Sequence, residues 1–132
     1  MSFQNIIGNI KVKNILTKSL KKNTILHSYM FNGKEGIGKK MMAEEFAKKI
    51  LCEDIVGECN NCKSCIEFSS KNHPDFSYIV PDGNTLKIEQ IRNFQSKVIE
   101  KPIISRKKVY IIDIILVLIS IVLFNVFKSL LK

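Results

Sequence analysis

The chain has 132 residues, of which 45% are hydrophobic and 25% charged, and its formal net charge is +9. This size allows one domain or a piece of a larger one, and the composition excludes an intrinsically disordered chain. The lysines are scattered, so the positive charge permits contact with nucleic acid but is first explained by a solvated surface. The sequence shows no signal-peptide pattern, so we expect a cytoplasmic protein whose four cysteines bind a metal or stay free.

The first half of the chain predicts a helix, a short strand and a second helix. Residues Ile7–Lys22 carry apolar side chains at helical spacing, namely Val12, Ile15, Leu16 and Leu20. The segment His27–Gly33 alternates between apolar and polar residues and then meets glycine, which is typical of a strand that ends in a loop. The second helix follows that loop, and its apolar face is expected to consist of Met42, Ala43, Phe46, Ala47 and Ile50.

The second half predicts a strand, a helix and another strand. A strand is expected at Asp75–Val80, and the turn Pro81–Asn84 closes it. A helix with Glu89 near its N-terminus follows, it ends before Pro102, and its apolar face is Ile88, Ile91, Phe94 and Val98. The β-branched and aromatic run Lys107–Asp113 predicts a buried parallel strand. The alternation of strands and helices therefore predicts an α/β fold with a parallel sheet and right-handed crossovers.

The loop before the second helix matches a phosphate-binding pattern. Gly33, Gly38 and Lys39 fit G-x-x-x-x-G-K, with Gly36 inside the same loop. Such glycines let backbone N–H groups close around phosphate oxygens, and the lysine reaches the outer phosphates. Lys40 occupies the place of the Ser or Thr that binds magnesium, and an ammonium group has no lone pair for a metal. We therefore expect a degenerate loop with weak nucleotide binding at most; the alternative is a chance glycine-rich turn.

The cysteines have the spacing of a metal site. Their pattern is C-x6-C-x2-C-x2-C, formed by Cys52, Cys59, Cys62 and Cys65. Such spacing allows thiolates to converge on one tetrahedral ion, so structural zinc is the favoured interpretation. An iron–sulfur cluster and unliganded thiols are the alternatives. His73 lies near in sequence, but a lone histidine is more often a structural hydrogen-bonding residue, and we leave it out of the ligand set.

Taken in order, these parts resemble the N-terminal AAA+ module of bacterial clamp-loader subunits, and most of all the delta-prime family of DNA polymerase III. The resemblance rests on the stretches IIGNIKVKNIL, LHSYMFNGKEGIGKK, the four-cysteine segment, NHPDFSYI, KIEQIR and KKVYIID. It implies a P-loop NTPase (AAA+) parallel-sheet core with an inserted zinc module at about residues 52–65. It implies zinc as a cofactor and ATP as a second candidate. The implied partners are the gamma/tau and delta subunits, the sliding clamp and primed DNA.

The family pattern ends at one residue. Asp113 matches the strand-end acid that steers magnesium, but Ile114 stands where a second acid is expected. We therefore expect a truncated AAA+ P-loop domain at residues 1–113 and an apolar tail at 114–132. The favoured interpretation of the tail is a reading-frame error. The alternatives are a membrane-spanning helix over Val109–Phe127 and a buried strand that runs into a core helix.

The Lys39–Lys40 pair decides between functions within this family, because the ATP-hydrolysing gamma/tau subunits carry an intact Lys-Thr at the end of the loop. We expect an incomplete, non-catalytic subunit of a DNA polymerase holoenzyme, a nucleotidyltransferase complex, that helps load the sliding clamp onto primed DNA. The alternatives are an ATP-hydrolysing clamp-loader subunit, a membrane-anchored zinc-binding protein, and a remnant without a function of its own.

Overall fold

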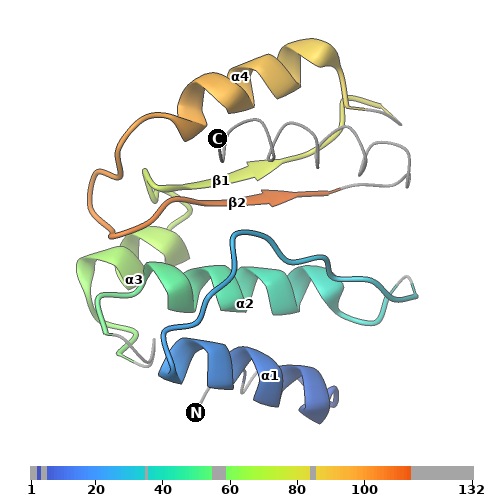
Figure 1. The fold of residues 1–132 in the computed structure, drawn as a ribbon, viewed down its shortest axis with the longest axis vertical. Helices are drawn as coiled ribbons and strands as arrows, with labels where there is room; N and C mark the ends of the chain where they lie inside the picture. The colour runs from blue at the N-terminus through green and yellow to red at the C-terminus, as the bar shows by residue number, and fades with distance from the viewer. Residues whose placement is uncertain (1–2, 4–5, 35, 55–58, 84–85, 114–132) are drawn as a thin grey trace. The chain divides into compact units, whose positions relative to one another are not determined.

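The computed structural model describes residues 3, 6–34, 36–54, 59–83 and 86–113. These residues form, in chain order, α1 (Ile10–Lys21), α2 (Lys39–Leu51), α3 (Lys63–Ser69), β1 (Phe76–Ile79), α4 (Ile88–Val98) and β2 (Val109–Ile112) (Figure 1). The chain divides into two compact units. Unit 1 is Met1–Phe76 with Pro102–Val109, and unit 2 is Ser77–Lys101 with Tyr110–Lys132.

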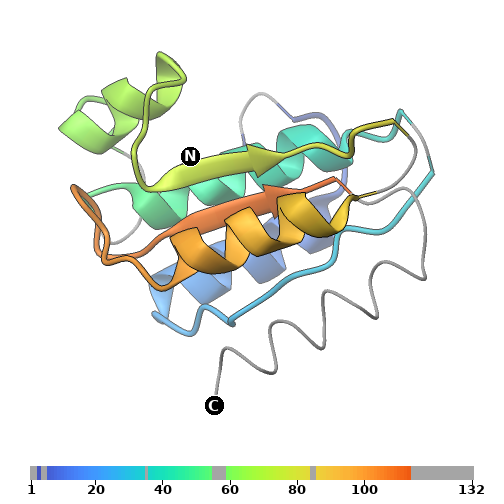
Figure 2. The same cartoon turned by 90° about the horizontal axis from the view of Figure 1, so that it is seen from above.

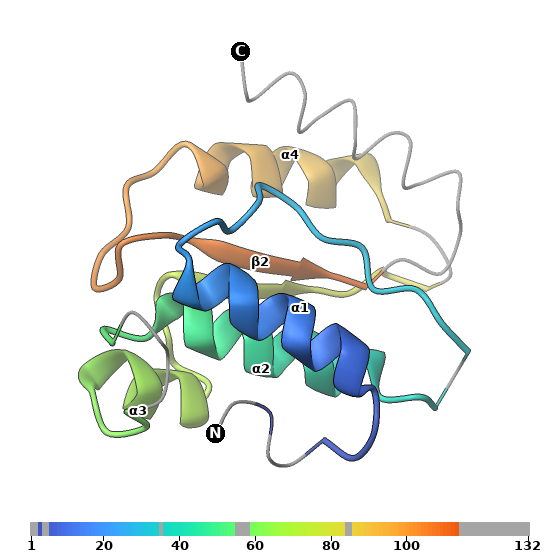
Figure 3. The same ribbon diagram turned by 60° about the horizontal axis from the view of Figure 1, so that its bottom comes forward.

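In unit 1, α1 lies alongside α2 (Figures 1 and 3), and the core forms between them. The buried residues of this core are Phe3, Ile6, Leu16, Leu20, Met42 and Phe46. The predicted apolar face of α2 is confirmed in its main members, but that of α1 is only half right. Leu16 and Leu20 are buried, whereas Val12 and Ile15 are exposed. The reason is geometric, because Leu16 and Leu20 lie one turn apart on the stripe that meets the core.

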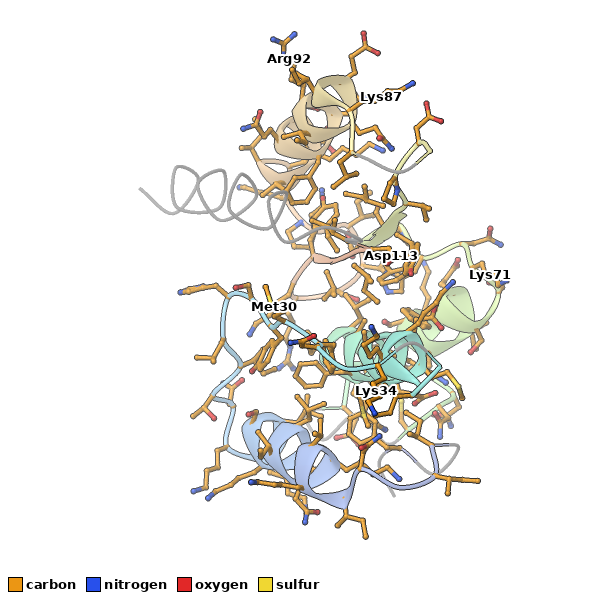
Figure 4. The ribbon with its side chains drawn as sticks, turned by 90° about the vertical axis from the view of Figure 1, so that its right-hand side faces the viewer. Met30, Lys34, Lys71, Lys87, Arg92 and Asp113 are labelled. Carbon is orange, nitrogen blue, oxygen red and sulfur yellow. The ribbon has the colours of Figure 1, made fainter. Side chains whose placement is uncertain are left out.

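The predicted strand at His27–Gly33 is wrong as secondary structure, although its side-chain alternation is right. Tyr29 and Phe31 are half-buried and pack against the core, and the Tyr29 ring meets Phe46 edge-on at 5.0 Å. Met30, which is labelled in Figure 4, lies between them and is 74% exposed. A strand requires a neighbour that supplies ladder hydrogen bonds. Among the described residues the sheet consists of β1 and β2, and this segment pairs with neither.

The seven-residue helix α3 was not predicted from the sequence. Its Phe68 ring lies 4.7 Å from the ring of Phe76, so α3 packs against the start of β1. Such a short segment has no long apolar repeat, so periodicity alone gives no signal for it.

β1 and β2 form a two-stranded sheet. The N–H of Val109 donates to the carbonyl of Asp75, and the N–H of Asp113 donates to that of Ile79, so equal steps along both strands make them parallel, as predicted. In unit 2, α4 covers one face of the strands (Figure 2), with Phe94 buried and edge-on to Tyr110 at 4.9 Å. Ile88, predicted on the same face, is 68% exposed, because it begins the helix before the stripe reaches the sheet.

In the part of the chain that the structure describes, no helix is long and apolar enough to cross a membrane. The predicted apolar tail at 114–132 lies outside the described residues, so the frame-error and membrane-span interpretations of it stay predictions. The division of domains at Asp113 is untested for the same reason.

Candidate functional site

Two helix ends hold the four cysteines in place. Cys52 is the C-cap of α2, and Cys62 is the N-cap of α3. The Sγ atom of Cys62 accepts a hydrogen bond from the backbone N–H of Cys65 at 3.4 Å, which fixes the two residues in one turn. Cys59 precedes that turn. Cys52 and Cys65 are buried and the other two are partly exposed, and all four are free thiols.

The four Sγ atoms converge, and all lie within 4.8 Å of one another. The Cys52 sulfur lies 3.1 Å from that of Cys59, 3.5 Å from that of Cys65 and 4.0 Å from that of Cys62. The Cys59 and Cys65 sulfurs are 3.9 Å apart. A zinc ion with Zn–S bonds of about 2.3 Å requires sulfur–sulfur edges of about 3.8 Å. The donor set and its spacing therefore fit one tetrahedral metal ion.

The pKa shifts of these thiols also favour a metal site. Burial raises the pKa of the Cys52 thiol and that of the Cys65 thiol. The hydrogen bond from Cys52 lowers the pKa of Cys59 to about 6. Without a cation, one thiol of the cluster ionises readily while the two buried ones hold their protons. A divalent cation supplies the charge that lets buried thiolates exist together, so the cluster is chemically suited to a closed structural site.

The glycine-rich loop before α2 has the backbone conformation that its glycines allow. Gly36 and Gly38 have φ of 80° and 93°, in the left-handed region, and Gly38 caps the N-terminus of α2. The Nζ atom of Lys39 donates to the carbonyl of Gly33 at 2.9 Å, so the lysine folds back across the loop. A Cβ atom on Gly33 would lie 3.2 Å from the Cγ2 atom of Ile37, so a larger residue there would require a small shift of the Ile37 side chain.

Two further predicted site residues are placed as follows. Lys40 is the second residue of α2 and is exposed. Asp113 follows the last residue of β2, as expected for a strand-end acid (Figure 4), and its Oδ2 accepts from the Tyr78 hydroxyl at 3.5 Å. Asp113 belongs to unit 2 and the loop to unit 1. Its role toward magnesium stays a prediction.

A buried hydrogen-bond network, which we call the serine–histidine network, was missed at the sequence level. It consists of the Leu51 carbonyl and the side chains of Ser64, His73 and Ser105. Ser64 Oγ donates to the Leu51 carbonyl at 2.6 Å and lies 2.8 Å from His73 Nε2. Ser105 Oγ lies 3.0 Å from the same carbonyl and 3.2 Å from His73 Nε2. The prediction that His73 is a structural hydrogen-bonding residue agrees with this arrangement.

Asp75 forms a second buried polar contact beside this network. Its carboxylate accepts hydrogen bonds from the backbone N–H groups of Ile103, Ile104 and Ser105, at 2.6, 2.8 and 2.7 Å. Burial opposes the ionised form, but these three donors lower the pKa of Asp75 below its ordinary value. The sequence signal was the pair His73 and Asp75 around a proline before a strand, which did not indicate their partners about 30 residues away.

The pairing of Ser64 with His73 is structural rather than catalytic. The backbone N–H of Asp75 donates to His73 Nδ1 at 3.0 Å, so the proton of the neutral ring lies on Nε2. Nε2–H then donates to Ser64 and cannot take the serine proton, which a general base must do. Ser64 is also 1% exposed, so no substrate reaches its hydroxyl.

His73 predicts a pH dependence of stability. Burial lowers its pKa, although Asp75 and Glu67 partly offset this. The unfolded chain therefore binds a proton at a higher pH than the folded chain. Neutral His73 contributes fully to the free energy of unfolding above the ordinary histidine pKa of about 6.5. As the pH drops from there toward the pKa of His73 in the folded chain, this contribution falls by about 1.4 kcal/mol per pH unit.

We expect chemical denaturation at pH 7.5 and 5.5, with saturating zinc, to show a smaller loss of stability for His73→Asn than for the unchanged chain. His27→Asn changes an exposed histidine and should keep the full loss. An equal loss in all three proteins would show that His73 does not titrate on unfolding.

The fold and the site define a mixed α/β protein with a small parallel sheet and a convergent four-cysteine cluster. Residues 8–116 match the family described as DNA polymerase III, delta subunit, and the chain belongs to this family.

Individual proteins similar to this chain are also DNA polymerase III subunits. The chain is 37% identical over 104 residues to DNA polymerase III subunit delta' of Bacillus subtilis, which covers 78% of this chain and 32% of the relative. It is 35% identical over 117 residues to the tau/gamma subunit of Haemophilus influenzae, covering 85% of this chain and 16% of the relative. The delta' subunit of Pseudomonas aeruginosa is 29% identical over 91 residues, 66% of this chain and 28% of the relative. The chain thus spans about a third or less of the length of these relatives.

Proposed function

We propose that this chain supplies the N-terminal module of a non-catalytic, delta-prime-like clamp-loader subunit, which helps load the sliding clamp onto primed DNA in replication. The observation that carries the proposal is Lys40 in the second position of α2, directly behind a loop whose sequence matches the G-x-x-x-x-G-K pattern. The similarity to delta' and tau/gamma subunits supports the clamp-loader setting. The module is a P-loop AAA+ domain at residues 1–113 in this proposal.

The four cysteines hold a structural zinc ion in this account. Cys52, Cys59, Cys62 and Cys65 supply four thiolates and leave no open position for a substrate. The ion joins the end of α2 to the start of α3, and its chemistry is limited to holding these thiolates together. The module therefore shapes a surface of the subunit rather than carrying out a reaction.

The loop retains phosphate affinity without turnover in this account. The backbone around Gly36 and Gly38 and the ammonium group of Lys39 would face the phosphates of ATP. Lys40 adds positive charge but cannot bind magnesium, so the developing charge of phosphoryl transfer is not neutralised in the usual way. Nucleotide binds weakly and is not hydrolysed.

The proposed partners are the gamma/tau and delta subunits of the clamp loader and, through the complex, the sliding clamp and primed DNA. The proposed location is the cytoplasm, where replication takes place. The ATP-hydrolysing alternative rests on the 35% identity to a tau/gamma subunit. The two proposals differ in whether this chain turns over ATP.

Lys40→Thr tests the degenerate loop directly. The restored hydroxyl should bind magnesium, so we expect Mg²⁺ to strengthen the binding of a fluorescent ATP analogue several-fold in this variant and to leave the unchanged chain almost unaffected. Lys48→Thr makes the same change in the last turn of α2, away from the loop, and should behave like the unchanged chain.

ATP hydrolysis separates the two functions. If the chain is delta-prime-like, we expect its Mg²⁺-dependent ATP hydrolysis to be no faster than that of the Lys39→Ala variant. Hydrolysis by the unchanged chain that disappears in Lys39→Ala would contradict the delta-prime-like function and establish the ATP-hydrolysing function.

A further inference from the structure

The serine–histidine network lies next to the two buried cysteines of the cluster, Cys52 and Cys65. Leu51 immediately precedes Cys52 in the chain, and Ser64 immediately precedes Cys65. The hydrogen bond from Ser64 Oγ to the Leu51 carbonyl, at 2.6 Å, therefore ties together the two backbone positions from which these ligands project. Any displacement of Cys52 or Cys65 moves one end of this bond.

The same two groups hold a segment far away in sequence. Ser105 Oγ lies 3.0 Å from the Leu51 carbonyl and 3.2 Å from Ser64 Oγ, across separations of 54 and 41 residues. His73 Nε2 lies within 3.2 Å of both hydroxyls. All of these groups belong to unit 1. A buried network of this kind is stable only when its members are all present, because each loss leaves an unpaired polar group.

The backbone of that segment also contacts Asp75. Three consecutive N–H groups, those of Ile103, Ile104 and Ser105, donate to its carboxylate at 2.6–2.8 Å. Residues 103–105 are thus fixed on one side by Asp75 and on the other by the groups adjoining Cys52 and Cys65. The segment lies shortly before β2, which begins at Val109.

We propose that Ser105 and His73 are positioning residues that couple metal binding by the four cysteines to the ordering of residues 103–105. The proposal rests on the structural metal site proposed above. A bound ion fixes Cys52 and Cys65, which fixes the Leu51 carbonyl and Ser64, which in turn complete the partners of Ser105. Coupling of this kind is reciprocal. If metal binding favours the ordered state of residues 103–105 by some factor, the ordered state raises the affinity for the metal by the same factor, so loss of the Ser105 contact lowers that affinity.

Hydrogen exchange of the full chain tests one direction. With one equivalent of Zn²⁺ bound, the peptide that contains residues 103–105 should exchange about tenfold more slowly than in the chelated chain. A peptide from α4, in unit 2, should show little change, and it reports whether the chelated chain has unfolded throughout.

Zinc affinity tests the reverse direction. Ser105→Ala should weaken Zn²⁺ binding about tenfold in competition with a chromophoric chelator, as is typical of residues that support metal ligands. Ser70→Ala is the matched control, because Ser70 is exposed and donates locally to the Glu67 carbonyl, at 3.1 Å. A merely structural serine would lower the melting temperature equally with and without Zn²⁺, whereas coupling makes the loss larger in the zinc-bound chain.

The outcomes are distinguishable. If the chain binds no zinc, the proposed metal site is wrong and the coupling falls with it. If one zinc binds but Ser105→Ala binds it as tightly as Ser70→Ala, the coupling is overturned and the metal site stands. If the chelated chain unfolds throughout, the α4 peptide loses protection together with the peptide of residues 103–105; the metal then stabilises the whole fold rather than this segment, and the specific coupling is overturned.

Discussion

Cys62→Ser is expected to abolish tight zinc binding and to unfold the segment from Cys52 to α3 locally. Cys62 contributes a metal ligand and also caps α3 through its Sγ atom. Serine keeps the N-cap of α3 but not the thiolate, and a helix of seven residues is not stable without tertiary support. Since metal binding and local folding are coupled, we expect limited proteolysis to cut between residues 52 and 69 at least tenfold faster than in the zinc-bound chain.

Chelation of the unchanged chain should reproduce the same cleavage pattern. Lys63→Ser is the control, since it places serine at the next position, on an exposed residue that is no ligand. It should remain resistant while zinc is bound. Equal resistance of Cys62→Ser and Lys63→Ser, with or without chelator, would refute a structural metal in this segment.

Asp75→Asn is expected to lower the free energy of unfolding by about 3–5 kcal/mol. Its carboxylate, in a residue 2% exposed, accepts three backbone hydrogen bonds. Hydrogen bonds to a charged group contribute about 1.5–3 kcal/mol each, and asparagine keeps one acceptor oxygen while its N–H donors would face the remaining backbone N–H groups, so one or two of the three bonds are lost. Folding lowers the pKa of Asp75. Its contribution to the free energy of unfolding is therefore present above the ordinary aspartate pKa of about 3.9, and it is lost as the pH falls through the pKa that Asp75 has in the folded chain.

Urea denaturation at pH 7 measures this loss. Asp82→Asn is the matched control, because Asp82 pairs with Lys87 at 2.7 Å on the surface of unit 2, with both side chains more than half exposed. An exposed pair contributes about 1 kcal/mol or less. A cost for Asp75→Asn as small as that for Asp82→Asn would show that the three hydrogen bonds do not stabilise the fold.

The parts of the fold and the site that could be predicted are local in sequence. The cysteine cluster lies within 14 consecutive residues, so spacing alone indicated that the thiols meet, and the structure confirms it. The helix after the glycine-rich loop was predicted because Met42, Phe46 and Ala47 repeat at the helical period. The strand end at Asp113 was also placed correctly.

The parts that could not be predicted depend on long-range partners. Ser105 contacts His73 across 32 residues, and an isolated serine carries no pattern that names a partner. The segment His27–Gly33 was predicted only in part. Its alternation correctly indicated which side chains face the core, but alternation does not show whether a neighbouring strand pairs with the segment. Likewise, Ile15 lies on the apolar repeat of α1 and is 54% exposed, since the repeat does not say how wide the contact with α2 is.

The metal content of the purified chain decides whether the four cysteines hold a structural ion. We expect one zinc ion per chain by elemental analysis. Replacement by cobalt should give the intense d–d absorption of a tetrahedral site and thiolate-to-metal charge transfer from four cysteines. Less than stoichiometric metal in a folded chain, or four thiols that react freely with a thiol reagent in the presence of zinc, would contradict a structural metal site.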